Sequence, residues 1–242
     1  MAGSQSVGLA IKTQSKIISN DAQYYSYVLG KAYIENNRYS KLKVIPKEII
    51  KPAPEFKLFQ KYFSGIYFTK EQCIEIDNIR ATIERFRKYN ITLHYCYLTC
   101  LLQSLDLVAR TAGHFDGALN VNNEKVKVRE TKSIYEEFCR RIEKFSTFKS
   151  NYKNLCYNLP AEELLKKIEG VDIIYIDPPY NHRQYSRYYH ILETCAKYDE
   201  NIRKNTKGLY PEYEFKSDFC YKDKVEDAFR KLLLLSMEKA KI

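Results

Sequence analysis

The sequence contains no tryptophan, only four histidines, and no cysteine pair with the CxxC spacing of zinc and redox motifs. Cys96 and Cys100 are four residues apart and would share one face of a helix, but no second Cys or His pair completes a tetrahedral zinc pattern. His190 and Glu193 also lie close in sequence and lack further ligands. We therefore expect no metal site. The odd number of cysteines, seven, indicates free thiols in a reducing cytosol.

Long apolar runs are absent as well. No stretch reaches the roughly 20 residues that cross a bilayer, and the N-terminus lacks the pattern of a signal peptide. Hydrophobic residues still make up 45% of the 242 residues, which is enough to bury a core and argues against a disordered chain. These features predict a soluble, cytoplasmic protein that does not enter a membrane.

The charge is unbalanced, with 40 Lys and Arg against 30 Asp and Glu and a formal net charge of +10. Such an excess suits a polyanionic partner such as nucleic acid. A lysine-rich proteome would produce the same excess, and charge by itself does not separate the two explanations.

The first 40 residues have the pattern of an α/β unit. The apolar run of residues 16–19 predicts a short strand that ends at Asn20 and Asp21, and either of these side chains can cap a helix over residues 22–35. The preceding segment, residues 1–8, is small and contains glycine. The order of elements is therefore loop, helix, strand and helix.

Residues 41–150 form a different kind of segment, because a proline-containing connector is followed by two long helical patterns. Thr69 and Gln72 form a capping box at the start of the first helix, and the second is predicted over residues 92–110. The alternation of residues 125–129 predicts an edge strand with a basic face. We place nucleic acid contacts on this stretch, at Lys125, Lys127 and Arg129, although a solvated basic surface explains each residue equally well.

The α/β pattern returns after residue 150. Residues 155–157 predict a short strand, and Pro160 fits the first position of a helix that reaches residue 167. Residues 171–176 are mostly apolar, as in a central parallel strand buried on both faces. Helical spacing resumes over residues 187–198 and in a last helix around residues 225–237.

The predicted buried strand ends in Asp177, Pro178, Pro179 and Tyr180. Two prolines fix the backbone and remove N–H groups, so the Asp177 carboxylate and the nearby carbonyls are held outward at the ligand-binding edge of a parallel sheet. A rigid pair of acceptors can hold an exocyclic amine while the Tyr180 ring lies on a planar base. This arrangement suits methyl transfer to the amine of an extrahelical adenine. The alternative is a tight strand-to-helix turn with an Asp cap.

The motif and its surroundings resemble the Dam-type N6-adenine-specific DNA methyltransferases of restriction–modification systems. The similarity continues through NHRQY and YHILET after the motif, and includes KIISNDAQYYSYVLGKAYIENN near the start. It implies S-adenosylmethionine as methyl donor, double-stranded DNA as substrate, a bacterial cytoplasmic location and a restriction endonuclease encoded nearby. It also implies an α/β, Rossmann-like core over residues 1–40 and 151–242. The mainly helical, basic insertion at residues 41–150 would then be the target-recognition region.

The resemblance assigns site residues by position. Residues 1–8 are similar to the family's glycine-rich cofactor loop, in which Ala2, Gly3, Ser4 and Gly8 keep the pattern, whereas Met1 replaces a Phe and Gln5 a Gly. Asp21 matches the acidic residue that accepts the ribose hydroxyls. The motif Asp177–Tyr180 is implied as the catalytic segment. Further DNA contacts are expected in the residues that follow it: Asn181, His182 and Arg183.

Several alternatives remain open at this stage. The strand expected before the cofactor loop and the strands expected after the last helix are not found, which predicts a fragment of a longer methyltransferase or a chain completed by a second polypeptide. A catalytically inactive fragment with weak DNA binding is therefore the second hypothesis. A cytosine-N4 methyltransferase would use the same amine chemistry, although the flanking similarity favours adenine.

Overall fold

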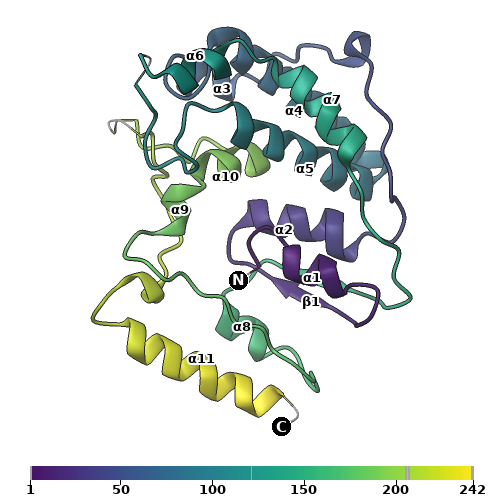
Figure 1. Ribbon diagram of the computed structural model, residues 1–242, viewed down its shortest axis with the longest axis vertical. Coiled ribbons are helices and arrows are strands. Elements are labelled where there is room, and N and C mark those ends of the chain that lie inside the picture. Colours follow the sequence, from purple (N-terminus) through teal and green to yellow (C-terminus); the bar gives the residue numbers. More distant parts are fainter. Residues whose placement is uncertain (1, 121, 205, 207, 241–242) are drawn as a thin grey trace.

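The computed structural model describes residues 2–120, 122–204, 206 and 208–240. One part of the molecule is made of packed helices, and the other holds a small sheet with helices beside it (Figure 1). The α-helices are α1 (Ser6–Ile11), α2 (Tyr24–Gly30), α3 (Leu58–Tyr62), α4 (Lys70–Tyr89), α5 (Ile91–Val108), α6 (Glu124–Glu130), α7 (Ile134–Lys144), α8 (Ala161–Leu165), α9 (Tyr185–Tyr188), α10 (His190–Lys197) and α11 (Val225–Lys239). The π-helix η1 (Lys31–Glu35) extends α2, and η2 (Lys47–Ile49) and η3 (Asp218–Cys220) are 3₁₀ turns.

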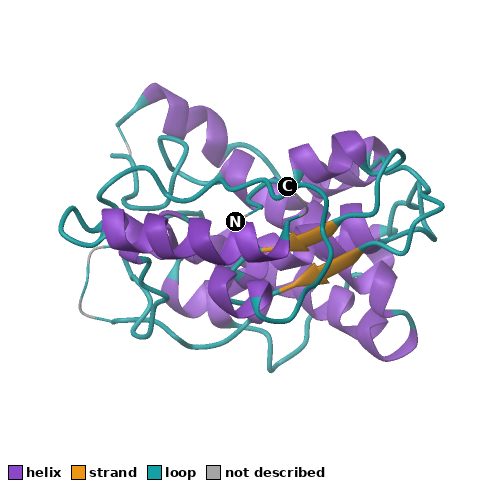
Figure 2. Cartoon of the chain, turned by 90° about the horizontal axis from the view of Figure 1, so that it is seen from below, coloured by secondary structure: helices purple, strands orange, loops and turns teal. Residues whose placement is uncertain are grey.

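The sheet consists of two parallel strands, β1 (Ile18–Asn20) and β2 (Leu155–Tyr157), with Ser19 opposite Cys156 (Figure 2). The predicted strands at both places and the opening order of helix, strand and helix are thus confirmed. Pro160 stands at the N-cap of α8, one residue before the predicted position. The helix predicted over residues 187–198 is interrupted at Tyr189, which separates α9 from α10.

The long helices begin where the sequence indicates. Thr69 accepts a hydrogen bond from the Gln72 amide while the Gln72 side chain accepts one from the Thr69 amide, so the predicted capping box is present. Asn90 caps α5 in a similar way through the Leu93 amide. Helix α5 packs between α4, α7, α2 and α10, and its buried side chains form the centre of the main core.

The main core unites all three segments of the sequence, because it contains Val28 of α2, Leu101 of α5 and Ile191 of α10. A second, smaller cluster lies beside α8 and α11 and is built on Leu165, Phe219 and Leu232. All seven cysteines are free thiols.

The edge strand predicted over residues 125–129 is wrong, because this stretch forms helix α6. The Asn123 side chain accepts a hydrogen bond from the Lys125 amide and so caps the helix. Strand-like alternation would place Val126 and Val128 on one covered face, yet Val126 is fully buried while Val128 is 60% exposed. Local capping therefore outweighed an alternation that no neighbouring strand supports.

The buried strand predicted over residues 171–176 is also wrong. The segment forms no strand ladder, and within the described residues its backbone pairing is a single parallel bridge from Val171 to Ala240. Ile174 and Ile176 rest against the smaller cluster, whereas Ile173 is 88% exposed. The apolar run is thus covered on one face only, because neither β1 nor β2 lies alongside it.

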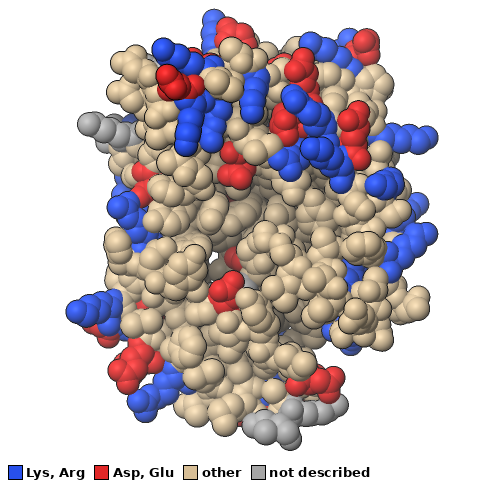
Figure 3. All heavy atoms as spheres, viewed as in Figure 1, with Lys and Arg blue, Asp and Glu red and all other residues tan. Residues whose placement is uncertain are grey.

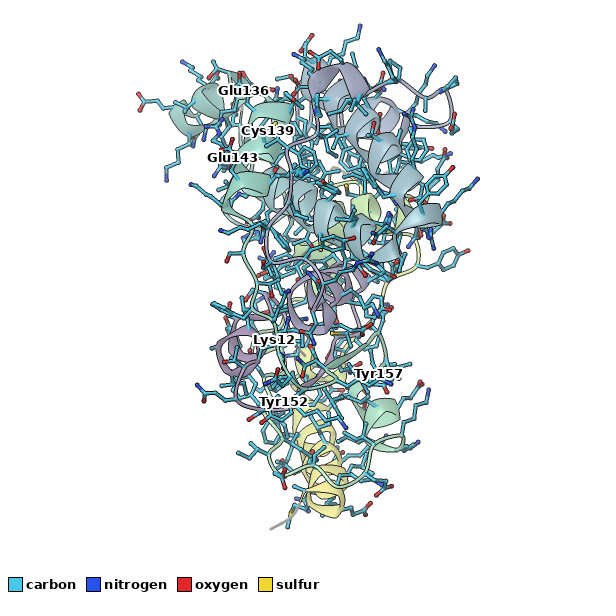
Figure 4. All side chains as sticks on the ribbon, turned by 90° about the vertical axis from the view of Figure 1, so that its right-hand side faces the viewer. Lys12, Glu136, Cys139, Glu143, Tyr152 and Tyr157 are labelled. Atoms are coloured by element: carbon cyan, nitrogen blue, oxygen red, sulfur yellow. The ribbon has the colours of Figure 1, made fainter. Side chains whose placement is uncertain are left out.

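Lys12 is fully buried and joins three separate parts of the chain (Figure 4). Its ammonium group donates hydrogen bonds to the backbone carbonyls of Tyr33, at 2.8 Å, and Asn36, and to the Thr147 hydroxyl. Burial lowers the pKa of Lys12 to about 8. The end of α1 is thereby fixed to η1 and to the connector after α7.

His94 of α5 provides a test of the packing between α4 and α5. Its Nδ1 atom lies 3.2 Å from the Ile83 carbonyl, and burial lowers its pKa to about 4. The unfolded chain therefore binds a proton first as the pH falls below about 6.5, so stability that is present above this value is lost towards pH 4. We expect the wild type to lose on the order of 2 kcal/mol more than His94→Gln over this window. Urea unfolding at several pH values measures this, and parallel curves for the two proteins would contradict it.

Candidate active site

A cavity of about 780 Å³ lies between the helical part and the small sheet. Its walls come from the N-terminal loop, the end of β1, the residues that follow β2, helices α2, α5 and α9, and the segments 177–180 and 215–219. Figure 3 shows this face hollowed near its middle, with Asp and Glu atoms at the hollow and Lys and Arg gathered above it. The volume lies within the range of small-molecule sites.

The N-terminal loop is held on Asp21. The amides of Ala2 and Gly3 donate to its Oδ2 atom, at 2.9 and 3.0 Å, and the Gln23 amide donates to Oδ1 at 2.9 Å. Gly3 adopts a positive φ of 48°, which glycine tolerates at little cost. Gly3 and Asp21 both line the cavity, so two of the predicted cofactor residues meet there.

Other predicted cofactor residues are placed differently. Ser4 lines the cavity, but Gly8 lies within α1, where an added Cβ would meet the Ile34 side chain at 3.0 Å. Gly8 is therefore small because of packing. Ala2 supplies its amide to Asp21, and Met1 lies outside the described residues.

Gln5, which stands where glycine was expected, supports the loop from inside. It is buried with φ of 68°, and its amide nitrogen donates to the Ser26 carbonyl at 3.0 Å. Its amide oxygen accepts from the Ser19 hydroxyl at 2.6 Å. Side-chain hydrogen bonds to Ser26 and Ser19 thus hold a left-handed backbone conformation that glycine would adopt without help.

The carboxyl ends of β1 and β2 are joined at the cavity by asparagine side chains. Asn20 donates to the Leu159 carbonyl at 2.9 Å and accepts from the Leu159 amide at 3.1 Å. Asn158 donates to the Asp21 carbonyl at 2.8 Å. Pro160 follows Leu159 and lines the same cavity.

All four residues of the motif Asp177–Tyr180 line the cavity from another side. Among the described residues, none donates a hydrogen bond to the Asp177 carboxylate or to the Pro178 carbonyl, so both remain available as acceptors. The Tyr180 side chain is 84% exposed. The geometry therefore presents two acceptors and one accessible aromatic ring at a single surface.

Helix α5 contributes polar side chains to the wall of the cavity, and the sequence did not lead us to predict them. Gln103 and Asp106 line the cavity, together with Arg141 of α7. Desolvation in this concave position raises the pKa of the Asp106 carboxyl. The signal in the sequence was the presence of polar residues within an otherwise apolar helix, between Leu102 and Val108.

The three residues after Tyr180 are not among those that line the cavity, and two of them bind each other. The Asn181 side chain accepts from the Arg183 amide at 2.9 Å, and the Arg183 guanidinium pairs with Asp116. His182 is exposed. Of the predicted DNA contacts here, Arg183 therefore has an intramolecular partner.

The basic residues of α6 also divide into two kinds. Lys125 and Lys127 are exposed on the helix surface. Arg129 instead donates to the carbonyls of Ala109, at 2.7 Å, and Thr111, so its guanidinium fixes α6 to the end of α5. None of the three lines the cavity.

The prediction that Asn20 or Asp21 caps α2 is wrong, because the helix is capped from a distant part of the chain. The Glu193 carboxylate of α10 accepts from the Tyr24 amide at 3.0 Å and from the Tyr25 amide at 2.8 Å. Asp21 instead accepts from the amides of Ala2 and Gly3 in the N-terminal loop and from the amide of Gln23, the residue before α2. Glu193 therefore connects α2, which follows Asp21, with α10, the second helix after Tyr180.

Two other features bear on function. Within residues 2–120, 122–204, 206 and 208–240, no group of three or more His, Cys, Asp or Glu residues has the arrangement needed to bind a metal ion. In the same part of the chain, none of the helices combines the length and apolar character required to span a bilayer.

The model of the D12 class N6 adenine-specific DNA methyltransferases matches residues 2–240. The chain belongs to this family. No solved structure matches the chain significantly.

Several curated proteins are similar to this D12-class chain over 96% of its length. They include the Type II methyltransferase M.FokI of Planomicrobium okeanokoites, at 34% identity, M.NlaIII of Neisseria lactamica, at 35%, and the modification methylase StsI of Streptococcus sanguinis, at 29%. The chain spans 37% of M.FokI, 69% of M.NlaIII and 37% of StsI.

The Glu193 cap gives a stability prediction for this D12-class chain. Glu193→Ala leaves the first amides of α2 without their acceptor, and we expect a loss of about 2 kcal/mol in the free energy of unfolding. Glu136→Ala is a suitable control, because that side chain is 70% exposed and forms only surface pairs on α7. Urea denaturation of the three proteins measures the difference, and equal stability of the two variants would refute the structural role of the cap.

Proposed function

We propose that this chain transfers a methyl group from S-adenosylmethionine to the N6 amine of adenine in double-stranded DNA. The observation that carries the proposal is the single cavity that joins the loop on Asp21 to the motif Asp177–Tyr180. Membership of the D12 class supports the same reaction.

Asp177 and Pro178 act on the target amine. Its lone pair is delocalised into the purine ring, so hydrogen bonds from the amine to the Asp177 carboxylate and the Pro178 carbonyl draw the nitrogen towards tetrahedral geometry. Tyr180 stacks on the base after it has left the duplex. The amine proton leaves after the methyl group has been accepted, so the chain needs no general base with a strongly shifted pKa.

The residues around Asp21 fit the methyl donor. A carboxylate offers about four acceptor sites, and the backbone amides of Ala2, Gly3 and Gln23 use three of them. The remaining site on Oδ1 suits a ribose hydroxyl, with Gly3 and Ser4 beside it and Pro160 against the cofactor base. S-adenosylmethionine supplies an electrophilic methyl group when bound.

The architecture extends this proposal. The two parallel strands carry ligand-facing residues at their carboxyl ends, which suits a Rossmann-like core formed by residues 1–40 and 151–242. Residues 41–150 then form the target-recognition insertion, with Lys125, Lys127 and His182 near DNA phosphates and Arg129 and Arg183 held by internal partners. Relatives named as Type II methyltransferases suggest a cognate restriction endonuclease encoded nearby as the functional partner.

A second candidate function is DNA binding without methyl transfer. It is favoured by the exposure of Ile173 and Tyr175, at 88% and 62%, because the segment that carries Asp177 is then supported on one face only. Cofactor binding separates the two candidates.

Titration calorimetry with S-adenosylmethionine tests the cofactor half of the cavity. We expect saturable heat for the wild type and about 10-fold weaker binding for Asp21→Asn, because a charged acceptor is lost. Glu55→Gln, the same change of charge at an exposed site, should bind as the wild type does. Absence of saturable heat in the wild type would refute the transferase proposal for this chain and leave the DNA-binding candidate.

Substitution of Tyr180 tests the part of the cavity that we propose binds the adenine base. With unmethylated genomic DNA and a radiolabelled methyl donor, we expect Tyr180→Ala to lose transfer by about 10-fold or more, because a base that stacks on one aromatic ring gains about 1–3 kcal/mol. Tyr180→Phe keeps the ring and should retain most of the activity. An active Tyr180→Ala protein would exclude the stacking role.

A further inference from the structure

The exposed ring of Tyr180 has one aromatic neighbour among the described residues. This neighbour is Tyr185, the first residue of α9, whose ring centroid lies 6.4 Å away with an interplanar angle of 77°. Edge-to-face pairs of this kind have a preferred geometry and add about 0.5–1.5 kcal/mol beyond their buried area. Tyr180 is otherwise 84% exposed, so this contact restricts the side-chain rotamers of a ring that solvent would leave free.

Tyr185 is itself held firmly. Its ring lies 5.8 Å from that of Tyr188 and 6.1 Å from that of Tyr189, and Tyr189 packs on Tyr25 of α2 at 5.3 Å. Tyr25 belongs to the turn of α2 that Glu193 caps. A continuous series of rings therefore runs from the motif to the main core, and Tyr180, Tyr185, Tyr189 and Tyr25 all line the cavity.

The chemistry of Tyr185 suits a fixed support. Burial raises the pKa of its hydroxyl above the usual range, with a further contribution from Tyr180, so the ring stays neutral at physiological pH. A neutral ring can present its positive edge to the face of a neighbouring ring without bringing a charge next to the Asp177 carboxylate.

We propose that Tyr185 is a positioning residue that orients the Tyr180 ring to receive the extrahelical adenine. The proposal rests on the proposed function, because it assigns to Tyr185 a part in binding the same base. Tyr185 acts through Tyr180 and does not itself touch the reacting atoms. Without it, base stacking must first restrict a freely rotating tyrosine, which weakens productive DNA binding and leaves the cofactor half of the cavity unchanged.

The test compares Tyr185→Leu, which removes the ring, with Tyr185→Phe, which keeps it. Tyr89→Leu is the matched control, because Tyr89 is 87% exposed at the end of α4 and forms no ring contact in the described part of the chain. For each protein we measure kcat/KM on unmethylated genomic DNA and the Kd for S-adenosylmethionine. We also record the ¹⁹F NMR signal of 3-fluorotyrosine incorporated at position 180.

We expect Tyr185→Leu to lower kcat/KM for DNA by about 3- to 10-fold, the factor that one aromatic pair contributes. Tyr185→Phe and Tyr89→Leu should remain within about 2-fold of the wild type, and the Kd for S-adenosylmethionine should not change in any variant. The ¹⁹F signal should shift and narrow in Tyr185→Leu only, as the ring at position 180 becomes free to rotate.

Two results would overturn the proposal. The first is a ¹⁹F signal in Tyr185→Leu that matches the Tyr89→Leu control, because the ring at position 180 would then be oriented without Tyr185. The second is an equal loss of activity in Tyr185→Phe and Tyr185→Leu, which would assign the effect to the hydroxyl. If the wild type transfers no methyl group, the proposed function fails, and the ¹⁹F measurement still decides whether Tyr185 holds Tyr180.

Discussion

The arrangement of the cavity depends on the Glu193 carboxylate, which binds the first two amides of α2 from a position 169 residues away in the sequence. A carboxylate is well placed there, because the amides at the start of a helix lack internal acceptors and carry partial positive charge. Helix α2 follows β1, which ends one residue before Asp21, and α10 is the second helix after the motif that ends at Tyr180. The cap therefore links the part of the chain that carries Asp21 to the part that carries the motif.

The motif Asp177–Tyr180 lies between two cores that are packed independently. Before it, residues 171–176 rest on the smaller cluster with α8 and α11. After it, Gln184 forms two hydrogen bonds with the backbone of Ser217, and α10 enters the main core through Ile191. The prolines then have a clear physical role, because they keep a short exposed segment stiff where little packing supports it.

Signals that act within a few residues could be read from the sequence. The capping box at Thr69, the helix that follows it and the two short strands all appear where local pattern places them. The error at α6 was local, because the Asn123 cap outweighed the strand-like alternation, whereas the other errors arose where distant contacts decide the outcome. Residues 171–176 have the composition of a buried strand, but burial requires neighbours that composition does not specify. The same holds for Glu193, whose partners on α2 no spacing rule connects to it.

The part of the cavity around Asp21 is organised differently from the part around the motif Asp177–Tyr180. Within the described part of the chain no group donates a hydrogen bond to the Asp177 carboxylate or the Pro178 carbonyl, whereas Asp21 already accepts three backbone hydrogen bonds and Gln5 fills the space beneath the loop. Side-chain hydrogen bonds thus fix the conformation of the loop before a ligand binds. Glycines at the same positions would have let its backbone adopt many conformations. The loop is already ordered, so ligand binding does not require free energy to order it. The ligand must, however, use the one acceptor site that Asp21 retains. Under the proposed function, selectivity at this end comes from fit to a fixed loop, and at the other end from two acceptors that suit the donors of an exocyclic amine.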